Sequence, residues 1–282
     1  MKTIISNNNF SAAFNHKGAE LISFKKDETE FIWNGNPEFW DKHSPVLFPI
    51  VGTLKNNQYQ YNNQTYTLSR HGFARDMEFD LIQKTNKNAV FSLKSSEETL
   101  KNYPFEFELQ IIYTLENNKL IIQYKVLNNG NENMYFSIGA HPAFSLPDNF
   151  ENYAVEFGNQ QSLECYLLED NLLSKNTKSI ELENGKLQLN YDLFKNDALI
   201  FKDFEQKELI LTENSKPFLK VNFEGFPDLG IWTKPNAPFL CIEPWFGYSD
   251  SLENNGNLSQ KEGIQKIDSQ SEFNASYSIE II

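Results

Sequence analysis

The chain has 282 residues, 40% of them hydrophobic and 14% aromatic, a composition typical of a folded globular protein rather than a disordered one. Its formal net charge of −13 argues against a nucleic-acid partner, because an acidic surface repels phosphate backbones and releases no counterions from them. The same charge disfavours docking to anionic membranes and is compatible with a neutral substrate.

The N-terminal segment, 1–9, reaches three consecutive asparagines before any apolar stretch long enough for a signal peptide. No later run approaches the roughly 20 apolar residues of a membrane span. The two cysteines, Cys165 and Cys241, are too few for a disulfide framework and lie in apolar runs, so we expect two reduced, buried thiols. These features predict a cytoplasmic protein.

β-Strands are predicted along most of the chain, because short or alternating apolar runs are separated by turns rich in asparagine and glycine. One hairpin is predicted over 59–68, with a two-residue turn at 62–63, and a longer one over 105–127, with its turn at 116–118. Further strands are predicted, in chain order, at 198–204, 208–212, 218–223, 229–233, 239–242 and 277–281.

Helical periodicity is nearly absent, and short helical turns are predicted only at 37–41 and 95–102. The chain contains no linker, no charge block and no repeat of fixed period. So many strands with short connections cannot remain one open sheet without curling or stacking. We therefore predict an all-β protein, a large antiparallel β-sandwich formed as a single domain by residues 1–282.

The first candidate site segment contains the only two arginines of the chain, Arg70 and Arg75, on either side of His71. The planar guanidinium group is suited to paired contacts with hydroxyl or carboxylate groups, so this clustering indicates a polar binding site. The alternative is a surface turn in which Arg75 pairs with Asp76 or Glu78.

The second segment places His141 between a predicted strand and Pro142, and the small residues before it leave room for a molecule to approach the imidazole. A core histidine bonded to a carbonyl group is the alternative interpretation. The other two histidines, His16 and His43, lack such neighbours, and we expect them to be solvated or structural.

The third segment places Glu243 at the end of the apolar strand 239–242. A carboxylate among apolar neighbours loses solvation, which raises its pKa toward the range useful to a general base. Trp232 and Trp245 add aromatic surfaces of the kind that stack on sugar rings. The alternative is a half-buried glutamate paired with a lysine such as Lys234.

Motifs for cofactors and metals are missing from the sequence. It has no Walker loop, no Gly-x-Gly-x-x-Gly after a strand, no Cys-x-x-Cys and no His-Glu-x-x-His. Ser249-Asp250 lacks the nucleophile elbow of a hydrolase. We therefore expect no cofactor and no metal, and proton-transfer chemistry on a small molecule fits the remaining candidates.

Taken together, the candidate segments resemble the aldose 1-epimerase (galactose mutarotase) family, and specifically its LacX-like branch. The matching stretches occur in family order and span nearly the whole chain: 44–52, 71–76, 139–144, 196–200, 230–235 and 241–247. The resemblance implies the mutarotase type of β-sandwich and an enzyme that interconverts the α and β anomers of an aldose. Thr53 departs from the branch, which commonly has an arginine there.

The resemblance also implies roles for individual residues. Glu243 would remove the proton of the anomeric hydroxyl, and His141 would protonate the ring oxygen. His71, Arg75 and Asp197 would hold hydroxyl groups and stabilise the charge that develops on the ring oxygen.

Three other functions are compatible with these residues. One is a hexose-6-phosphate 1-epimerase that holds a phosphate with Arg70, Arg75, Lys55 and Lys234, although the acidic surface and Thr53 count against it. Another is a carbohydrate-binding protein without catalysis. The third is a glycosidase that uses Glu243 and Asp197 as paired carboxylates. Which aldose is preferred, and whether the protein is a monomer or a homodimer, is left open by the sequence.

Overall fold

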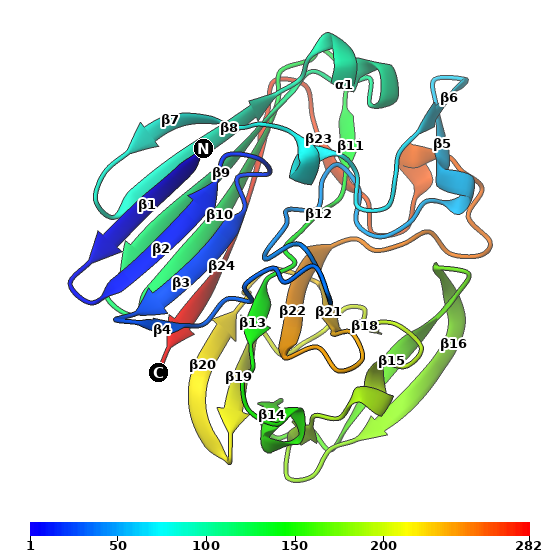
Figure 1. Ribbon diagram of the computed structural model, residues 1–282. Helices are drawn as coiled ribbons and strands as arrows, with labels where there is room; N and C mark the ends of the chain where they lie inside the picture. Colours follow the sequence, from blue (N-terminus) through cyan, green and yellow to red (C-terminus); the bar gives the residue numbers. More distant parts are fainter.

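Antiparallel strands form nearly all of the regular structure in the computed structural model, which describes residues 1–282 (Figure 1). The predicted all-β fold is confirmed. The one α-helix, α1 (Glu97–Asn102), confirms the helical turn predicted at 95–102. It begins after Ser96, whose hydroxyl accepts a hydrogen bond from the Thr99 N–H. The segment predicted as a helical turn at 37–41 makes a single turn, in which the Trp40 N–H donates to the Asn36 carbonyl at 3.0 Å, and no helix follows it. No helix has the length and apolar character needed to cross a bilayer.

A nine-stranded antiparallel sheet forms the largest layer. Its long central hairpin confirms the one predicted at 105–127, and inward residues are buried at every second position of both strands. In spatial order its strands are β17 (Lys186–Gln188), β14 (Tyr153–Glu156), β19 (Glu208–Glu213), β20 (Lys216–Asn222), β24 (Glu272–Ile281), β10 (Lys119–Asn128), β9 (Phe107–Glu116), β8 (Asn88–Lys94) and β7 (Asp80–Lys84).

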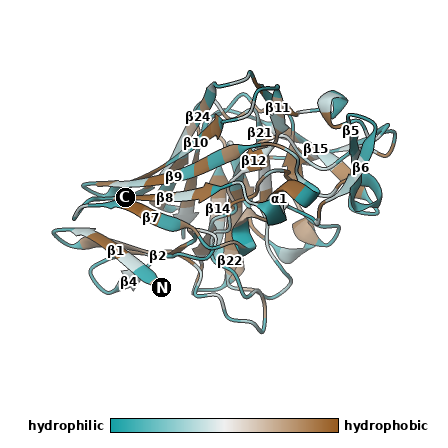
Figure 2. Ribbon diagram, turned by 90° about the horizontal axis from the view of Figure 1, so that it is seen from above, coloured by the Kyte–Doolittle hydropathy of each residue, from teal (hydrophilic) through white to brown (hydrophobic).

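A four-stranded sheet covers one part of this layer, and the two lie side by side in Figures 1 and 2. Phe14 joins them, because its ring stacks on Tyr113 at 4.0 Å between centroids and meets Phe91 edge-on at 5.9 Å. The strands of the small sheet, in order, are β1 (Lys2–Asn7), β2 (Phe10–Asn15), β3 (Leu21–Lys26) and β4 (Thr29–Glu30).

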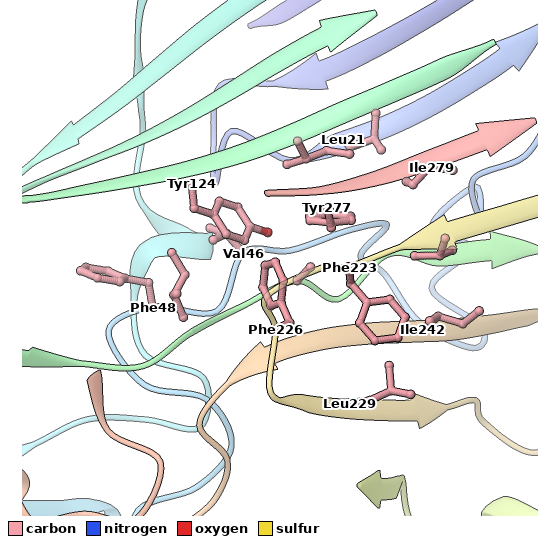
Figure 3. Packing of buried hydrophobic residues seen from close by; sticks show 14 of the residues in the cluster. Leu21, Val46, Phe48, Tyr124, Phe223, Phe226, Leu229, Ile242, Tyr277 and Ile279 are labelled. Carbon is pink, nitrogen blue, oxygen red and sulfur yellow. The ribbon is translucent and has the colours of Figure 1, made fainter. Parts of the chain in front are cut away.

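A seven-stranded sheet packs against the other part of the large layer. Figure 3 shows Leu229 and Ile242 of this sheet pointing toward Phe223, Tyr277 and Ile279, and all five are fully or almost fully buried. Its strands, in order, are β12 (Ile138–Gly139), β22 (Phe239–Phe246), β21 (Asp228–Trp232), β18 (Leu199–Phe201), β15 (Ser162–Glu169) and β16 (Leu172–Glu181), and β13 (Ala143–Ser145) also pairs with β22.

Short hairpins and 3-10 helices complete the fold. The hairpin predicted at 59–68 is confirmed, with positive φ at both Asn62 and Asn63 in its turn. The remaining elements are β5 (Gln58–Tyr61), β6 (Gln64–Thr67), β11 (Met134–Phe136), β23 (Gln265–Ile267), η1 (Lys55–Asn57), η2 (Ala74–Asp76), η3 (Phe150–Asn152), η4 (Tyr191–Phe194) and η5 (Leu258–Gln260).

One core cluster of 64 buried residues runs between the stacked sheets and draws members from all three of them. This continuity supports the prediction of one domain over 1–282. Burial removes apolar side chains from water at about 25 cal/mol per Å², so this cluster is the main favourable contribution to folding. Both cysteines are buried free thiols, as predicted.

Candidate active site

The site lies on the outer face of the seven-stranded sheet, and β22 shows how the sequence builds it. Leu240 and Ile242 of this strand belong to the main core cluster. Side chains alternate along a strand, so Cys241, Glu243 and Trp245 face the opposite side. The strand runs on to Phe246, so the predicted strand end at Ile242 is wrong, and Glu243 lies inside the strand.

A gap in strand pairing brings His141 to Glu243. β12 pairs with β22 at Gly139↔Trp245, and β13 pairs with it at Ala143↔Cys241. The same register continued across the gap between these strands puts His141 directly opposite Glu243. Cross-strand neighbours on one face lie within contact distance, and here His141 Nε2 is 3.3 Å from Glu243 Oε2.

Pro244 lies beside this gap. A proline has no N–H to donate, so it is tolerated in a sheet only where the ladder is locally interrupted. The chain on the other side leaves the regular ladder between residues 139 and 143, where only two backbone hydrogen bonds cross to β22. The Ala140 N–H donates to the Pro244 carbonyl at 3.0 Å, and the Ile242 N–H donates to the Pro142 carbonyl at 3.3 Å. The proline and the irregular strand opposite it therefore leave the imidazole free to enter the site.

The pair lies in a cavity of about 490 Å³ on the surface of this sheet. All seven residues predicted for the site line the cavity: Arg70, His71, Arg75, His141, Asp197, Trp232 and Glu243. Lys234, which the phosphate hypothesis also used, lines it too. Lys55 does not, because its ammonium group binds the Leu252 carbonyl at 2.7 Å next to a neighbouring hollow.

Arg70 and Arg75 line the cavity wall, where each is fixed by a polar contact. Arg70 Nη2 lies 3.6 Å from Asp197 Oδ2, and Arg75 Nη2 donates to the Arg70 carbonyl at 2.9 Å. Arg75 Nε also lies 3.6 Å from Asp76 Oδ2, so the ion pair expected for a surface turn coexists with a place in the cavity. The 70–75 segment therefore fixes two guanidinium groups beside His141 and Glu243, and Arg70 brings the Asp197 carboxylate to the same wall.

His71 is buried in the same wall with its backbone at a φ of 68°, a conformation that few residues other than glycine adopt. Its Nδ1 accepts the Gly52 N–H at 3.1 Å, and Arg70 Nε lies 3.2 Å from its Nε2. Burial lowers the pKa of His71 well below its usual value, and His141 and the two arginines add to the effect. The ring is therefore neutral.

Burial also controls the ionisation of the pair itself. Glu243 is 1% exposed, and burial raises the pKa of its carboxyl well above the usual value, an effect that Arg70 opposes and Asp197 reinforces. Burial, with smaller contributions from Arg70 and Arg75, lowers the pKa of His141 to about 3. Burial therefore favours a carboxylic acid beside a neutral imidazole, with one titratable proton shared by the two residues.

Aromatic rings enclose His141 on several sides, and one of them was missed by the sequence analysis. Trp40 lies over the imidazole with ring centroids 4.8 Å apart and planes inclined by 30°. Trp232 meets the imidazole edge-on at 5.6 Å. Trp40 is held by the tight turn before it, where the Trp33 indole donates to the Trp40 carbonyl at 2.9 Å and Lys234 donates to the Phe39 carbonyl at 2.7 Å.

Trp245 occupies the space that was expected to admit a ligand beside His141. A Cβ atom on Gly139 would lie 2.5 Å from the Trp245 ring, and one on Gly230 would lie 2.4 Å from it. A larger residue at either glycine position would collide with the indole of Trp245. The small residues before His141 therefore leave room for this side chain. Lys195 and Ser249 also line the cavity. No pattern in the sequence indicated Lys195, and Ser249 was considered only as a hydrolase nucleophile and set aside.

The fold, the cavity and its polar lining indicate a class of protein, an enzyme that acts on a small polar molecule. The model of the family described as aldose 1-epimerase matches residues 1–265. The chain belongs to this aldose 1-epimerase family, as the sequence resemblance predicted.

Individual relatives agree with this assignment. The chain is 35% identical over 294 residues to the plasmid-encoded protein LacX of Lactococcus lactis subsp. lactis, with 99% of this chain and 98% of LacX covered. A crystal structure of a galactose mutarotase related enzyme from Lactobacillus acidophilus superposes with a TM-score of 0.95 at 36% identity, covering 100% of this chain and 97% of that one. A galactose mutarotase-like protein from Lactobacillus casei ATCC 334 gives 0.92 at 28% identity, with both chains fully covered.

Proposed function

We propose that the protein is an aldose 1-epimerase in which Glu243 and His141 transfer the protons that open and close the sugar ring. The observation that carries the proposal is the 3.3 Å approach of these two buried groups inside one cavity. General acid–base catalysis needs both groups within hydrogen-bond reach of the same substrate, and a pair this close can meet the adjacent O1 and O5 atoms of one hemiacetal.

The proposed reaction balances without any other reactant. Glu243 accepts the proton of the anomeric hydroxyl, the O1–H electrons form the C1=O1 double bond, and the C1–O5 bond breaks. O5 takes the proton of His141 as it leaves. Rotation about C1–C2 then presents the other face of the aldehyde, and the reverse transfers close the ring as the opposite anomer. Two positioned groups of this kind contribute about 10²–10⁴-fold each.

The pair reaches the necessary ionisation by moving its single proton. Before substrate binds, the proton is on Glu243, since burial favours the neutral forms of both groups. Its transfer to His141 gives a carboxylate and an imidazolium, the forms that the reaction needs. A sugar hydroxyl bound to the carboxylate stabilises this charged arrangement, so substrate binding activates the pair.

The other lining residues hold the sugar while C1 turns. Arg70, Arg75 and Asp197 offer charged donors and acceptors, and His71 offers a neutral polar ring. Directional contacts to hydroxyl groups away from C1 keep the rest of the ring fixed, which lowers the entropy cost of the reaction. Trp232 supplies an apolar face for the C–H side of the ring.

The two buried free thiols and the acidic charge support a cytoplasmic location.

The rate should show no histidine titration near pH 6.5, which is about the ordinary pKa of an imidazole. A second proton joins the pair only near the pKa of His141, about 3. At the alkaline side the single proton is lost only above the raised pKa of Glu243. Measuring kcat/KM against pH, after subtraction of the spontaneous reaction, tests this; a single step near pH 6.5 would contradict it.

Replacing the aromatic face should weaken substrate binding more than catalysis. We expect Trp232→Leu to raise KM about five- to tenfold, equivalent to about 1–1.4 kcal/mol of lost stacking, with a smaller change in kcat. Trp232→Phe keeps a ring in place and serves as the matched variant, with KM within about twofold of the wild-type value. Equal KM values for the leucine and phenylalanine variants would show that the sugar does not stack here.

The basic lining residues favour a test of one alternative substrate. Arg70, Arg75, Lys195 and Lys234 all line the cavity, as a site for a phosphorylated hexose would require. Lys55 is engaged elsewhere, and Asp197 pairs with Arg70, so we propose a free aldose as the substrate. Rates for glucose and glucose 6-phosphate compared under the same conditions decide between them, and sugar binding without any acceleration would indicate a binding protein.

A further inference from the structure

Cys241 lies next to the acid–base pair and has no part in the proposed reaction. It is fully buried on the cavity side of β22, two residues before Glu243, and pairs with Ala143 of β13 and Trp232 of β21. One possible ligand atom from each of His141, Cys241 and Glu243 lies within 4.8 Å of the other two. An imidazole, a thiol and a carboxyl group therefore converge on one point beside the cavity, which His141 and Glu243 line and Cys241 does not.

Two atoms of this group lack hydrogen-bond partners. Glu243 Oε2 and His141 Nδ1 are both buried and unpaired. The 3.3 Å contact joins Glu243 Oε2 to the other ring nitrogen, Nε2, and lacks the alignment of a hydrogen bond. Buried polar atoms are almost always satisfied in folded proteins, so unpaired ones indicate a site for a partner from outside the chain. For Glu243 a sugar hydroxyl is one such partner, and a cation is another.

We propose that His141, Cys241 and Glu243 form an inhibitory binding site for a borderline-soft divalent cation of the Zn²⁺ type. Nitrogen, sulfur and oxygen ligands in one set suit zinc, whereas Mg²⁺ and Ca²⁺ require oxygen ligands alone. Tetrahedral zinc holds such atoms about 3.3–3.8 Å apart, so side-chain shifts of about 1 Å close the site. Because His141 and Glu243 line the cavity, a water molecule from that side would take the fourth position.

The charges nearby limit the strength of this site. Arg70 and Arg75 lie close enough to affect the protonation of His141, and they repel a cation. Asp197 offsets this effect in part through its pairing with Arg70. Three ligands with these neighbours predict reversible binding that is weaker than in a four-ligand structural site. Binding also releases the protons of Glu243 and Cys241 to solvent, because the metal needs their deprotonated forms.

Inhibition follows from which ligands are used. A cation bound to Glu243 and His141 occupies the lone pairs that accept protons in the reaction. The sugar and the metal therefore exclude one another. This part of the inference rests on the proposed function. The metal site itself does not, because its formation is visible without any turnover.

The spectrum of Co²⁺ bound to the whole protein tests the site directly. Co²⁺ replaces Zn²⁺ with the same geometry and gives a sulfur-to-cobalt charge-transfer band in the near ultraviolet when a thiolate is a ligand. We expect this band with the wild type and with Cys165→Ser, the matched variant at the other buried cysteine. It should be lost in Cys241→Ser and Cys241→Ala. No band in the wild type, or a band that persists in both position-241 variants, would overturn the proposal.

Inhibition by Zn²⁺ is measured separately, with each variant referred to its own rate without metal. We expect Zn²⁺ to inhibit the wild type and Cys165→Ser equally, and the concentration for half-inhibition to rise about 10–100-fold in Cys241→Ala. Equal sensitivity of all three proteins would overturn the inhibitory role. If no epimerase activity exists, the cobalt band still appears, so failure of the proposed function and failure of the metal site are distinguishable.

Discussion

Glu243→Gln should reduce kcat for anomer interconversion by about 10²–10⁴-fold, the range that one general base contributes. The amide has the shape of the carboxyl group but cannot accept the hydroxyl proton or return it. The fold should survive the change, because burial favours the neutral form of Glu243 and the amide is neutral as well. The measurement is the decay of optical rotation of a fresh α-anomer, with the spontaneous rate subtracted.

Glu253→Gln is the matched control for this substitution. Glu253 is exposed and pairs with Lys175 on the surface, outside the cavity. Exposed pairs of this kind contribute about 0–1 kcal/mol, so neither stability nor rate should change measurably. A Glu243→Gln protein that is folded and retains more than about a tenth of the wild-type kcat would remove Glu243 from the role of base.

His141→Asn should lower kcat by a similar factor of about 10²–10⁴, because no other group stands opposite Glu243 to protonate the ring oxygen. Combining it with Glu243→Gln should add little to the larger single effect. When two groups act as one catalytic unit, the effects of substituting them are strongly non-additive, because neither group can complete the reaction without the other. The same polarimetric assay on the two single variants and the double variant measures this coupling.

His16→Asn provides the histidine control. His16 is buried outside the cavity and shares a hydrogen bond of 3.0 Å with the Thr3 hydroxyl, which is the structural role expected for it. We expect His16→Asn to lower the midpoint temperature of thermal unfolding and to leave the rate of anomer interconversion unchanged. Independent, multiplicative effects of the substitutions at 141 and 243 would mean that these residues act in separate steps, and not as a pair.

Much of the fold could be predicted because local sequence and strand pairing agree. The asparagine pairs at 62–63 and 117–118 tolerate the turns that fix their hairpins, and the alternation in β9 and β10 matches their buried faces. One error came from proline, because Pro244 suggested the end of a strand that in fact continues.

The site could be predicted only in part. His141 and Glu243 were recognised as unusual from their neighbours, but their contact depends on a register that runs across a gap between two short strands. Trp40 could not be predicted as a lining residue, because it is brought over His141 by tertiary contacts from a loop. The same limit applies to Cys241, whose apolar surroundings in the sequence indicated only burial.

A crystal structure of the Glu243→Gln variant with galactose tests most directly whether the two groups act on one hemiacetal. We expect the anomeric oxygen O1 within about 3 Å of the side chain at position 243, and the ring oxygen O5 within about 3 Å of a nitrogen of His141. A sugar bound in the cavity with C1 and O5 turned away from both side chains, or bound at another place on the protein, would contradict the proposed mechanism.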